Sequence, residues 1–222
     1  MRLCHFISSQ YALSAIRDRR LKVAQVQDLN DPFEFLCSDL PDPQSRRDFS
    51  SFKIWAAQRY GILCFTRAWR NPLMWSHYAD KHKGVVLEFE VSDDTTVKVS
   101  YVQERISFDL AKLIGQQQFS LSDAEIIFAT KSHHWSYERE VRAPIDLTKC
   151  VRDGQHLFYP FDGKLQLRGV VTGHRCTLTE NDFVTHLRED DQLLMRRARL
   201  AFRSFNVVRQ RALQPRILNR SA

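Results

Sequence analysis

The amino-acid sequence predicts an α+β fold in which a central mixed or split β-sheet is flanked by helices. The chain has 222 residues, 43% of them hydrophobic and 27% charged, a balance typical of one folded domain or of two small ones. Strand-like and helix-like segments follow one another without an internal repeat or a low-complexity stretch. We therefore expect a single domain over residues 1–208 and a basic C-terminal tail over residues 209–222.

The N-terminal part begins with a short strand at about residues 3–7. A helix follows at about residues 8–20, where a serine can cap the N-terminus and apolar residues recur at helical spacing. Residues 21–26 indicate a second strand, and Asn30, Asp31 and Pro32 indicate a turn.

In the middle of the chain, residues 41–60 indicate a polar loop that leads into a helix. Residues 61–66 are typical of a buried strand, and Asn71 with Pro72 begins a helix over residues 73–81. Gly84 is expected to end that helix before a strand at residues 85–91, and two helical segments are expected between about residues 104 and 134.

The clearest strand signal covers residues 138–147. Arg139 and the apolar residues that follow it at period two lie on one side, whereas Glu138, Glu140, Arg142 and Asp146 lie on the other. Two interpretations remain open for this polar side. It is either a solvated face, with Arg142 paired to Glu140, or the carboxylate-bearing wall of an active site, because residues two apart on a strand can reach one substrate.

Positive charge is concentrated at the C-terminus. The net charge is +7, but residues 192–222 alone contribute +8 through arginines, with no lysine and no acid. Apolar residues alternate with the first of these arginines, which predicts a packed strand or helix, and residues 211–222 are expected to form a loose terminus. This segment either binds nucleic acid or an acidic protein, through Arg196, Arg197, Arg199 and Arg203, or forms a solvated sheet edge.

Several functional classes are disfavoured by the sequence. No apolar run has the roughly 18 residues of a membrane-spanning helix, so a cytoplasmic protein without a membrane partner is expected. The five cysteines are scattered without a CxxC pair, and His77 with His82 lacks the spacing of paired ligands on one helical face, so no metal is predicted. Neither a GxGxxG nor a GxxxxGK run is present.

The ordered motifs LCHFIS, LNDPFE, ILCFT, NPLMWSHYADKHKGVVLEF, KSHHWSYEREVR and RGVVTGHRCTLTENDF resemble the bacterial domain-of-unknown-function family DUF2971. The resemblance extends from about Leu3 to Val208, and LNDPFE together with MWSHYADKHKG is its most specific part. This resemblance implies a family and no activity.

A more distant resemblance implies a mechanism. An early strand with His5, a central aromatic motif with Tyr78 and a late strand with an ExE pair are similar to the layout of ADP-ribosyltransferase folds. Breaking the bond between ribose and nicotinamide builds positive charge on the sugar, which a pre-placed carboxylate stabilises. The resemblance implies that Glu140 is the catalytic acid and that Glu138 assists the acceptor. It also implies that NAD is held by His5 at the ribose, by Tyr78 or Trp75 at the nicotinamide, and by Arg142.

The sequence therefore predicts two alternative functions. The first is an NAD-using ADP-ribosyltransferase or NAD glycohydrolase of unknown acceptor, acting on a nucleotide-like molecule in a defence or toxin setting. The second is a non-catalytic module that binds nucleic acid or protein through its arginine-rich segment. A nuclease that holds Mg²⁺ through Asp31, Glu34 and the ExE carboxylates is a third option, although the sequence has no dense acidic cluster.

Overall fold

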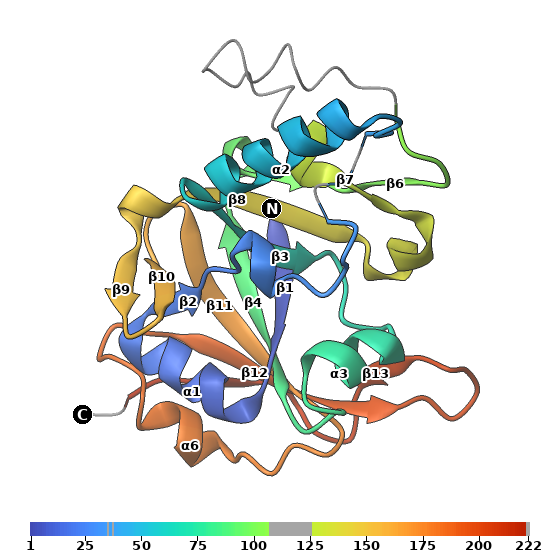
Figure 1. Cartoon of the computed structure of the whole chain (residues 1–222). Coiled ribbons are helices and arrows are strands. Elements are labelled where there is room, and N and C mark those ends of the chain that lie inside the picture. The colour runs from blue at the N-terminus through green and yellow to red at the C-terminus, as the bar shows by residue number, and fades with distance from the viewer. Residues whose placement is uncertain (35, 37, 107–125, 221–222) are drawn as a thin grey trace. The chain divides into compact units, whose positions relative to one another are not determined.

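The computed structural model confirms the α+β class, with a large mixed sheet and several helices (Figure 1). It describes residues 1–34, 36, 38–106 and 126–220. The chain divides into two compact units. The first unit comprises Met1–Leu21, Phe65–Asp94 and Pro160–Ala222, and the second comprises Lys22–Cys64 and Thr95–Tyr159.

The first unit is built on a mixed sheet. Its strands, in order across the sheet, are β13 (Val207–Arg209), β12 (Leu193–Leu200), β11 (Leu165–Thr172), β4 (Val85–Val91) and β1 (Arg2–Ile7). β11 and β12 are parallel, whereas β4 pairs antiparallel with both β1 and β11. β12 and β13 form an antiparallel hairpin, and β14 (Arg216–Leu218) pairs antiparallel with the start of β12.

The core of the first unit is centred on β4. The apolar residues of this strand are buried on both faces because strands flank it and helices cover it, and Phe89 makes edge contacts with Phe65 and Phe161. The helices of this unit are α1 (Ser9–Asp18), α3 (Pro72–Tyr78) and α6 (Glu180–Val184). α1 contacts β4 and α6 and buries its apolar face, and α3 contacts β1.

The second unit carries shorter strands around one long helix. Its strands are β5 (Val97–Lys98), β6 (Ser100–Val102), β7 (Thr130–Ser132), β8 (Glu140–Asp146) and β9 (Val151–Asp153). β2 (Arg20–Lys22), β3 (Tyr60–Thr66) and β10 (His156–Pro160) cross the boundary between the units. β8 lies between β3 and β5, and β6 pairs parallel with β7.

Helix α2 (Pro43–Ala57) supplies the core of the second unit. Asp42 caps this helix by accepting hydrogen bonds from the backbone N–H groups of Gln44 and Ser45 at 2.8 and 2.9 Å, and Pro43 occupies its first turn. Its buried face, Phe49, Phe52 and Ala56, packs in one apolar cluster with Ile62 and Phe128. The remaining short helical turns are η1 (Val26–Asp28), η2 (Asp93–Thr95), η3 (His133–Glu138) and η4 (Leu147–Lys149).

Most predicted elements are confirmed, with several shifted boundaries. The strand expected at residues 21–26 ends at Lys22, because residues 26–28 form η1. Most of the helical region expected between residues 104 and 134 lies outside the described residues. Of its described end, residues 126–129 are helical as predicted, whereas the following residues form β7 and the start of η3. The terminus expected to be loose contains β14, because Leu193 and Leu194 offer it an edge to pair with.

Helix α3 ends earlier than predicted, at Tyr78, and Gly84 does not end it. Asp80, Lys81 and His82 adopt left-handed φ values of 43°, 51° and 71°, so the chain turns away before the glycine. Gly84 serves close packing instead, because a Cβ there would lie 2.3 Å from the backbone oxygen of Ile7.

Along the described part of the chain, no helix combines the length and the apolar character that a membrane crossing requires.

The close approach at Gly84 yields a stability prediction. Gly84→Ala should lower the free energy of unfolding by about 1–3 kcal/mol, because backbone atoms must move to admit the methyl group. Gly163→Ala is the matched control, since a Cβ there meets nothing within 4 Å. Urea denaturation of both variants measures the difference, and equal stability of the two would contradict the packing role.

Candidate functional site

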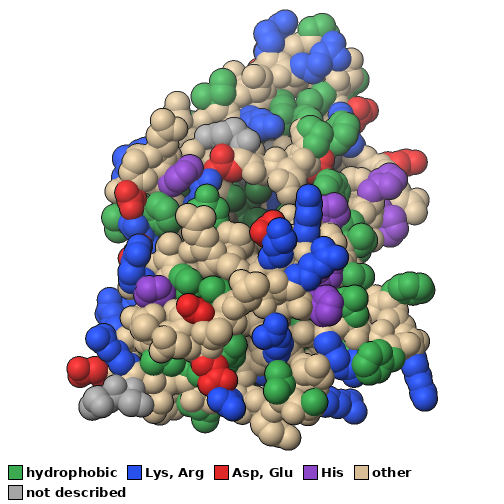
Figure 2. Space-filling view, turned by 90° about the horizontal axis from the view of Figure 1, so that it is seen from below, with side chains coloured by type: hydrophobic (Ala, Val, Ile, Leu, Met, Phe, Trp, Pro, Cys, Tyr) green, Lys and Arg blue, Asp and Glu red, His purple; other side chains and the backbone are tan. Residues whose placement is uncertain are grey.

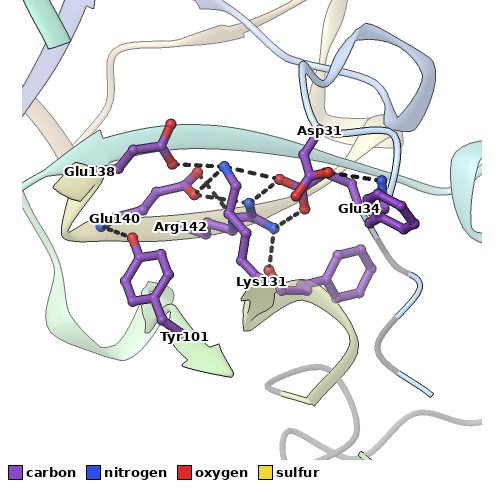
Figure 3. Close-up of polar contacts among 9 residues, drawn as sticks. Asp31, Glu34, Tyr101, Lys131, Glu138, Glu140 and Arg142 are labelled. Carbon is purple, nitrogen blue, oxygen red and sulfur yellow. Dashed lines mark hydrogen bonds and ion pairs between the residues drawn. The ribbon is translucent and has the colours of Figure 1, made fainter. Parts of the chain in front are cut away.

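Five charged side chains form a buried ion-pair network in the second unit (Figure 3). Their exposed fractions are 0% for Arg142, 2% for Glu34 and Glu138, and 7% for Lys131 and Glu140. Buried charges are tolerated only when they are paired and hydrogen-bonded. The contacts within the cluster therefore decide whether any of these side chains is left to bind a ligand.

Four different elements bring these side chains together. Glu140 and Arg142 are two residues apart on β8 and therefore share one face of the strand. Glu138 is the last residue of η3, and Arg139 has a left-handed φ of 48° that turns the chain into β8. Lys131 comes from β7, and Glu34 closes the turn that residues 30–32 begin, because its backbone N–H donates to the oxygen of Asp31.

Arg142 uses all of its hydrogen-bond donors inside this network. Nη1 and Nη2 donate to the two carboxylate oxygens of Glu34 at 2.8 and 2.6 Å. Nε and Nη2 donate to the two oxygens of Glu140 at 3.0 and 2.9 Å, and Nη1 also donates to the backbone oxygen of Phe128 at 2.8 Å. A guanidinium has five N–H donors, so none is left for a ligand.

Lys131 connects the three carboxylates. Its Nζ lies 2.7 Å from Glu138, 3.2 Å from Glu34 and 3.4 Å from Glu140. The same ammonium group lies 4.8 Å from the centre of the Trp135 ring, close enough for a cation–π contact.

The network keeps Glu140 ionised. Burial by itself would raise the pKa of Glu140, but the adjacent Arg142 and Lys131 outweigh burial and hold this pKa below its ordinary value. The thiol of Cys64 also hydrogen-bonds to Glu140, and burial together with that carboxylate raises the pKa of Cys64 well above its usual range. Burial raises the pKa of Tyr101 to about 12, and the Tyr101 oxygen accepts a hydrogen bond from the Glu140 backbone N–H at 2.7 Å.

The solvated-face interpretation of residues 138–147 is wrong. Glu138 lies before the strand, and Glu140 and Arg142 are buried because Glu34 and Lys131 cover that face of β8. Arg139, expected on the core side, is exposed because of its left-handed turn. Arg142 therefore has a structural role here, and its assignment to NAD binding loses its physical basis.

The remaining predicted NAD-binding residues lie in the first unit. Trp75 is fully buried, donates its indole N–H to the backbone oxygen of Trp69 at 2.6 Å and packs edge-on against Phe6. No face of Trp75 is therefore open for stacking on nicotinamide. His5 on β1 and Tyr78 at the end of α3 are both partly buried.

Asp31, Glu34 and Glu140 are not placed to hold a metal ion. Glu34 and Glu140 meet in one network, and Asp31 is also buried, with Oδ1 accepting from the backbone N–H of Phe33. Arg142 and Lys131 occupy the space where a cation would have to bind. Within residues 1–34, 36, 38–106 and 126–220, no three His, Cys, Asp or Glu side chains are placed to hold a metal ion.

A second cluster of charge lies at the hairpin of β12 and β13 in the first unit. Two of the predicted arginines are used by the fold, because Arg196 pairs with Glu88 and Arg197 donates to the backbone oxygen of Cys176. Arg199 and Arg203 instead line an open hollow of about 570 Å³. We call its five arginines the basic hairpin surface: Arg70, Arg199, Arg203, Arg209 and Arg211.

A backbone hydrogen bond joins two of the segments that form the hollow. The backbone N–H of Val207 donates to the oxygen of Arg70 at 2.8 Å, which fixes the hairpin beside the segment of residues 69–70. Figure 2, viewed from below, shows Lys and Arg side chains beside hydrophobic ones on the right, where the connection between β12 and β13 projects in Figure 1. Within the described part of the chain, no acidic residue lines this hollow.

Sequence reasoning missed several members of both clusters. From the sequence, Glu34 was predicted only as a Mg²⁺ ligand of a nuclease, and no functional role was predicted for Lys131 or Arg70. The sequence did carry one signal for the first cluster. Lys131 and Arg142 flank Glu138 and Glu140 along the chain, and carboxylates that become buried need cationic partners.

Comparison with known proteins gives a match to one family over part of the chain and no activity. Residues 74–143 match the model of a family described as "Protein of unknown function (DUF2971)". The match confirms the resemblance to that family over a segment that runs from within α3 to within β8. No curated protein and no solved structure matches the chain. The ADP-ribosyltransferase-like fold stays a prediction.

Removing the charge of Arg142 should strongly destabilise the second unit. Arg142→Met should lower the free energy of unfolding by about 3–5 kcal/mol, because Glu34 and Glu140 would remain buried without their cation. Arg168→Met, which breaks the exposed pair with Glu90, should cost about 0–1 kcal/mol. Urea denaturation compares the two, and an equally mild loss for Arg142→Met would contradict the network's structural role.

The depressed pKa of Glu140 predicts an acid-sensitive fold. The unfolded chain protonates this carboxyl near its ordinary pKa of about 4.3, before the folded protein does, so stability falls as the pH drops through the folded pKa. Wild type should therefore lose more free energy of unfolding between about pH 6 and about pH 3 than Glu140→Gln does. Urea denaturation at both pH values tests this, and identical losses would refute it.

Proposed function

We propose that this DUF2971-like chain binds nucleic acid through the basic hairpin surface. The observation that carries the proposal is the clustering of five arginines around one open hollow without an acidic side chain among its lining residues. A patch of like charge attracts a polyanion, whereas the same charge spread over a surface does not.

The arginines of this surface are available for phosphate. Among the described residues, the ion pairs include none to these five side chains, in contrast to Arg196, which pairs with Glu88. A guanidinium presents a planar fork of donors that matches two phosphate oxygens, so arginine is well suited to hold a sugar-phosphate backbone.

The distribution of charge along the chain supports the same function. Residues 192–222 contain no acid, so the basic hairpin surface has no local carboxylate to neutralise it. Two acids of the first unit pair with basic residues outside this surface, because Glu90 pairs with Arg168 and Asp191 with Arg19.

Salt dependence provides the test. Arg203→Ser combined with Arg211→Ser should weaken binding of a labelled oligonucleotide, measured by fluorescence anisotropy. It should also reduce the slope of log affinity against log salt by roughly 1.4 to 1.8, because two phosphate contacts are lost. Arg47→Ser with Arg152→Ser removes the same charge from exposed positions outside this surface and is the matched control. Equal effects of the two pairs would contradict a specific surface.

A second candidate is the NAD-using reaction, with ADP-ribosyl transfer or NAD hydrolysis as its outcome. The observation behind it is that Glu140 is held ionised, the state that a carboxylate needs to stabilise positive charge on ribose, although Arg142 and Lys131 already compensate this charge. Release of nicotinamide from NAD by the wild type, and its loss in Glu140→Gln, would support this function. Absence of release from NAD by the wild type, with and without nucleic acid as acceptor, would contradict it.

A further inference from the structure

Two phenylalanines project from the connection between β12 and β13. Phe202 and Phe205 are 91% and 99% exposed, although each carries a large apolar ring. Single exposed apolar residues are common on protein surfaces and need no explanation. Here, however, two aromatic rings stand at the tip of one hairpin, between arginines of the basic hairpin surface.

Hydrogen bonds close the backbone turn that carries these rings. The backbone N–H of Ala201 donates to the oxygen of Asn206 at 2.9 Å, which closes the turn, and Asn206 Nδ2 donates to Ser204 Oγ at 3.0 Å. The flanking strands are paired up to Leu200 and Val207. The rings are therefore presented to solvent by a closed turn.

Aromatic and cationic groups are directly coupled at this tip. The guanidinium carbon of Arg199 lies 4.4 Å from the centre of the Phe202 ring, and Nη1 of Arg199 donates to the backbone oxygen of Leu200. Phe202 lines the same hollow as the arginines and as Trp69. A planar apolar face and phosphate-binding donors therefore lie within one site.

We infer that the basic hairpin surface takes single-stranded nucleic acid, with unpaired bases stacked on Phe202 and Phe205 and the backbone phosphates at the surrounding arginines. This inference rests on the proposed function and specifies its ligand. Bases of a duplex stack on one another and leave only phosphates to a surface of this kind, whereas unpaired bases offer a free π-face to an aromatic ring.

The test separates stacking from charge. The full-length protein is titrated with labelled oligouridylate and oligothymidylate of about 16 nucleotides, and with RNA and DNA duplexes of the same length. Phe202→Ala with Phe205→Ala should lower affinity for the single strands by about 5- to 150-fold per ring, because each stacked base contributes about 1–3 kcal/mol. Duplex affinity and the salt slope should stay near their wild-type values, because the arginines remain.

Two controls test whether an aromatic ring is sufficient and whether the variants remain folded. Phe202→Trp with Phe205→Trp should retain single-strand affinity, because indole rings also stack on bases. Both variants should unfold at the wild-type urea concentration, since the rings are exposed. The two single-strand probes show whether RNA or DNA is preferred.

Several results would overturn the inference. Equal loss of single-strand and duplex affinity in the alanine variant, or no loss of either, would remove the stacking role while leaving the proposed function intact. Failure of the wild type to bind any of the four probes would remove the proposed function as well. Polyglutamate that competes as well as an unlabelled oligonucleotide would identify an acidic-protein site. If the wild type sediments as a dimer and the alanine variant as a monomer, with unchanged affinity for nucleic acid, the rings form a contact between two copies of the chain.

Discussion

The guanidinium of Arg142 connects parts of the second unit that are far apart in the sequence. It holds the Glu34 carboxylate, 108 residues away, with two hydrogen bonds, and it holds Glu140 on its own strand with two more. Because both carboxylates are buried, neither can be left without its cation, and Lys131 completes the compensation. One set of ion pairs therefore holds together the turn at residues 30–32, β7, η3 and β8.

The sequence predicted the strands and helices whose signals are local, although the serine expected to cap the first helix, Ser8, makes no side-chain cap hydrogen bond. Residues 61–66 and 85–91 are apolar runs that suit buried strands, and Asn71 with Pro72 begins a helix as expected. The site at β8 could not be predicted in the same way. Alternation along a strand shows which residues share a face, but only tertiary contacts with Glu34 and Lys131 show that this face is buried.

The same limit applies to the basic C-terminal segment. Its alternation predicted a packed element, and β12 with β13 confirms it. Which arginines remain available depends on neighbouring strands, because Glu88 on β4 engages Arg196 and the Cys176 backbone engages Arg197. Two groups of arginines can therefore be distinguished here: Arg196 and Arg197, which the fold engages, and the arginines of the basic hairpin surface, which it leaves toward solvent. The second group is the physical basis of the proposed binding function.

The location of bound nucleic acid tests this account most directly. Ultraviolet cross-linking of the full-length protein to oligouridylate, followed by mass spectrometry of the peptides, maps the contact without a substitution. We predict cross-links at Phe202 or Phe205 and in the peptide that contains Trp69, and their loss at high salt as the phosphate contacts weaken. Cross-links confined to peptides outside residues 69–70 and 199–211 would contradict the account.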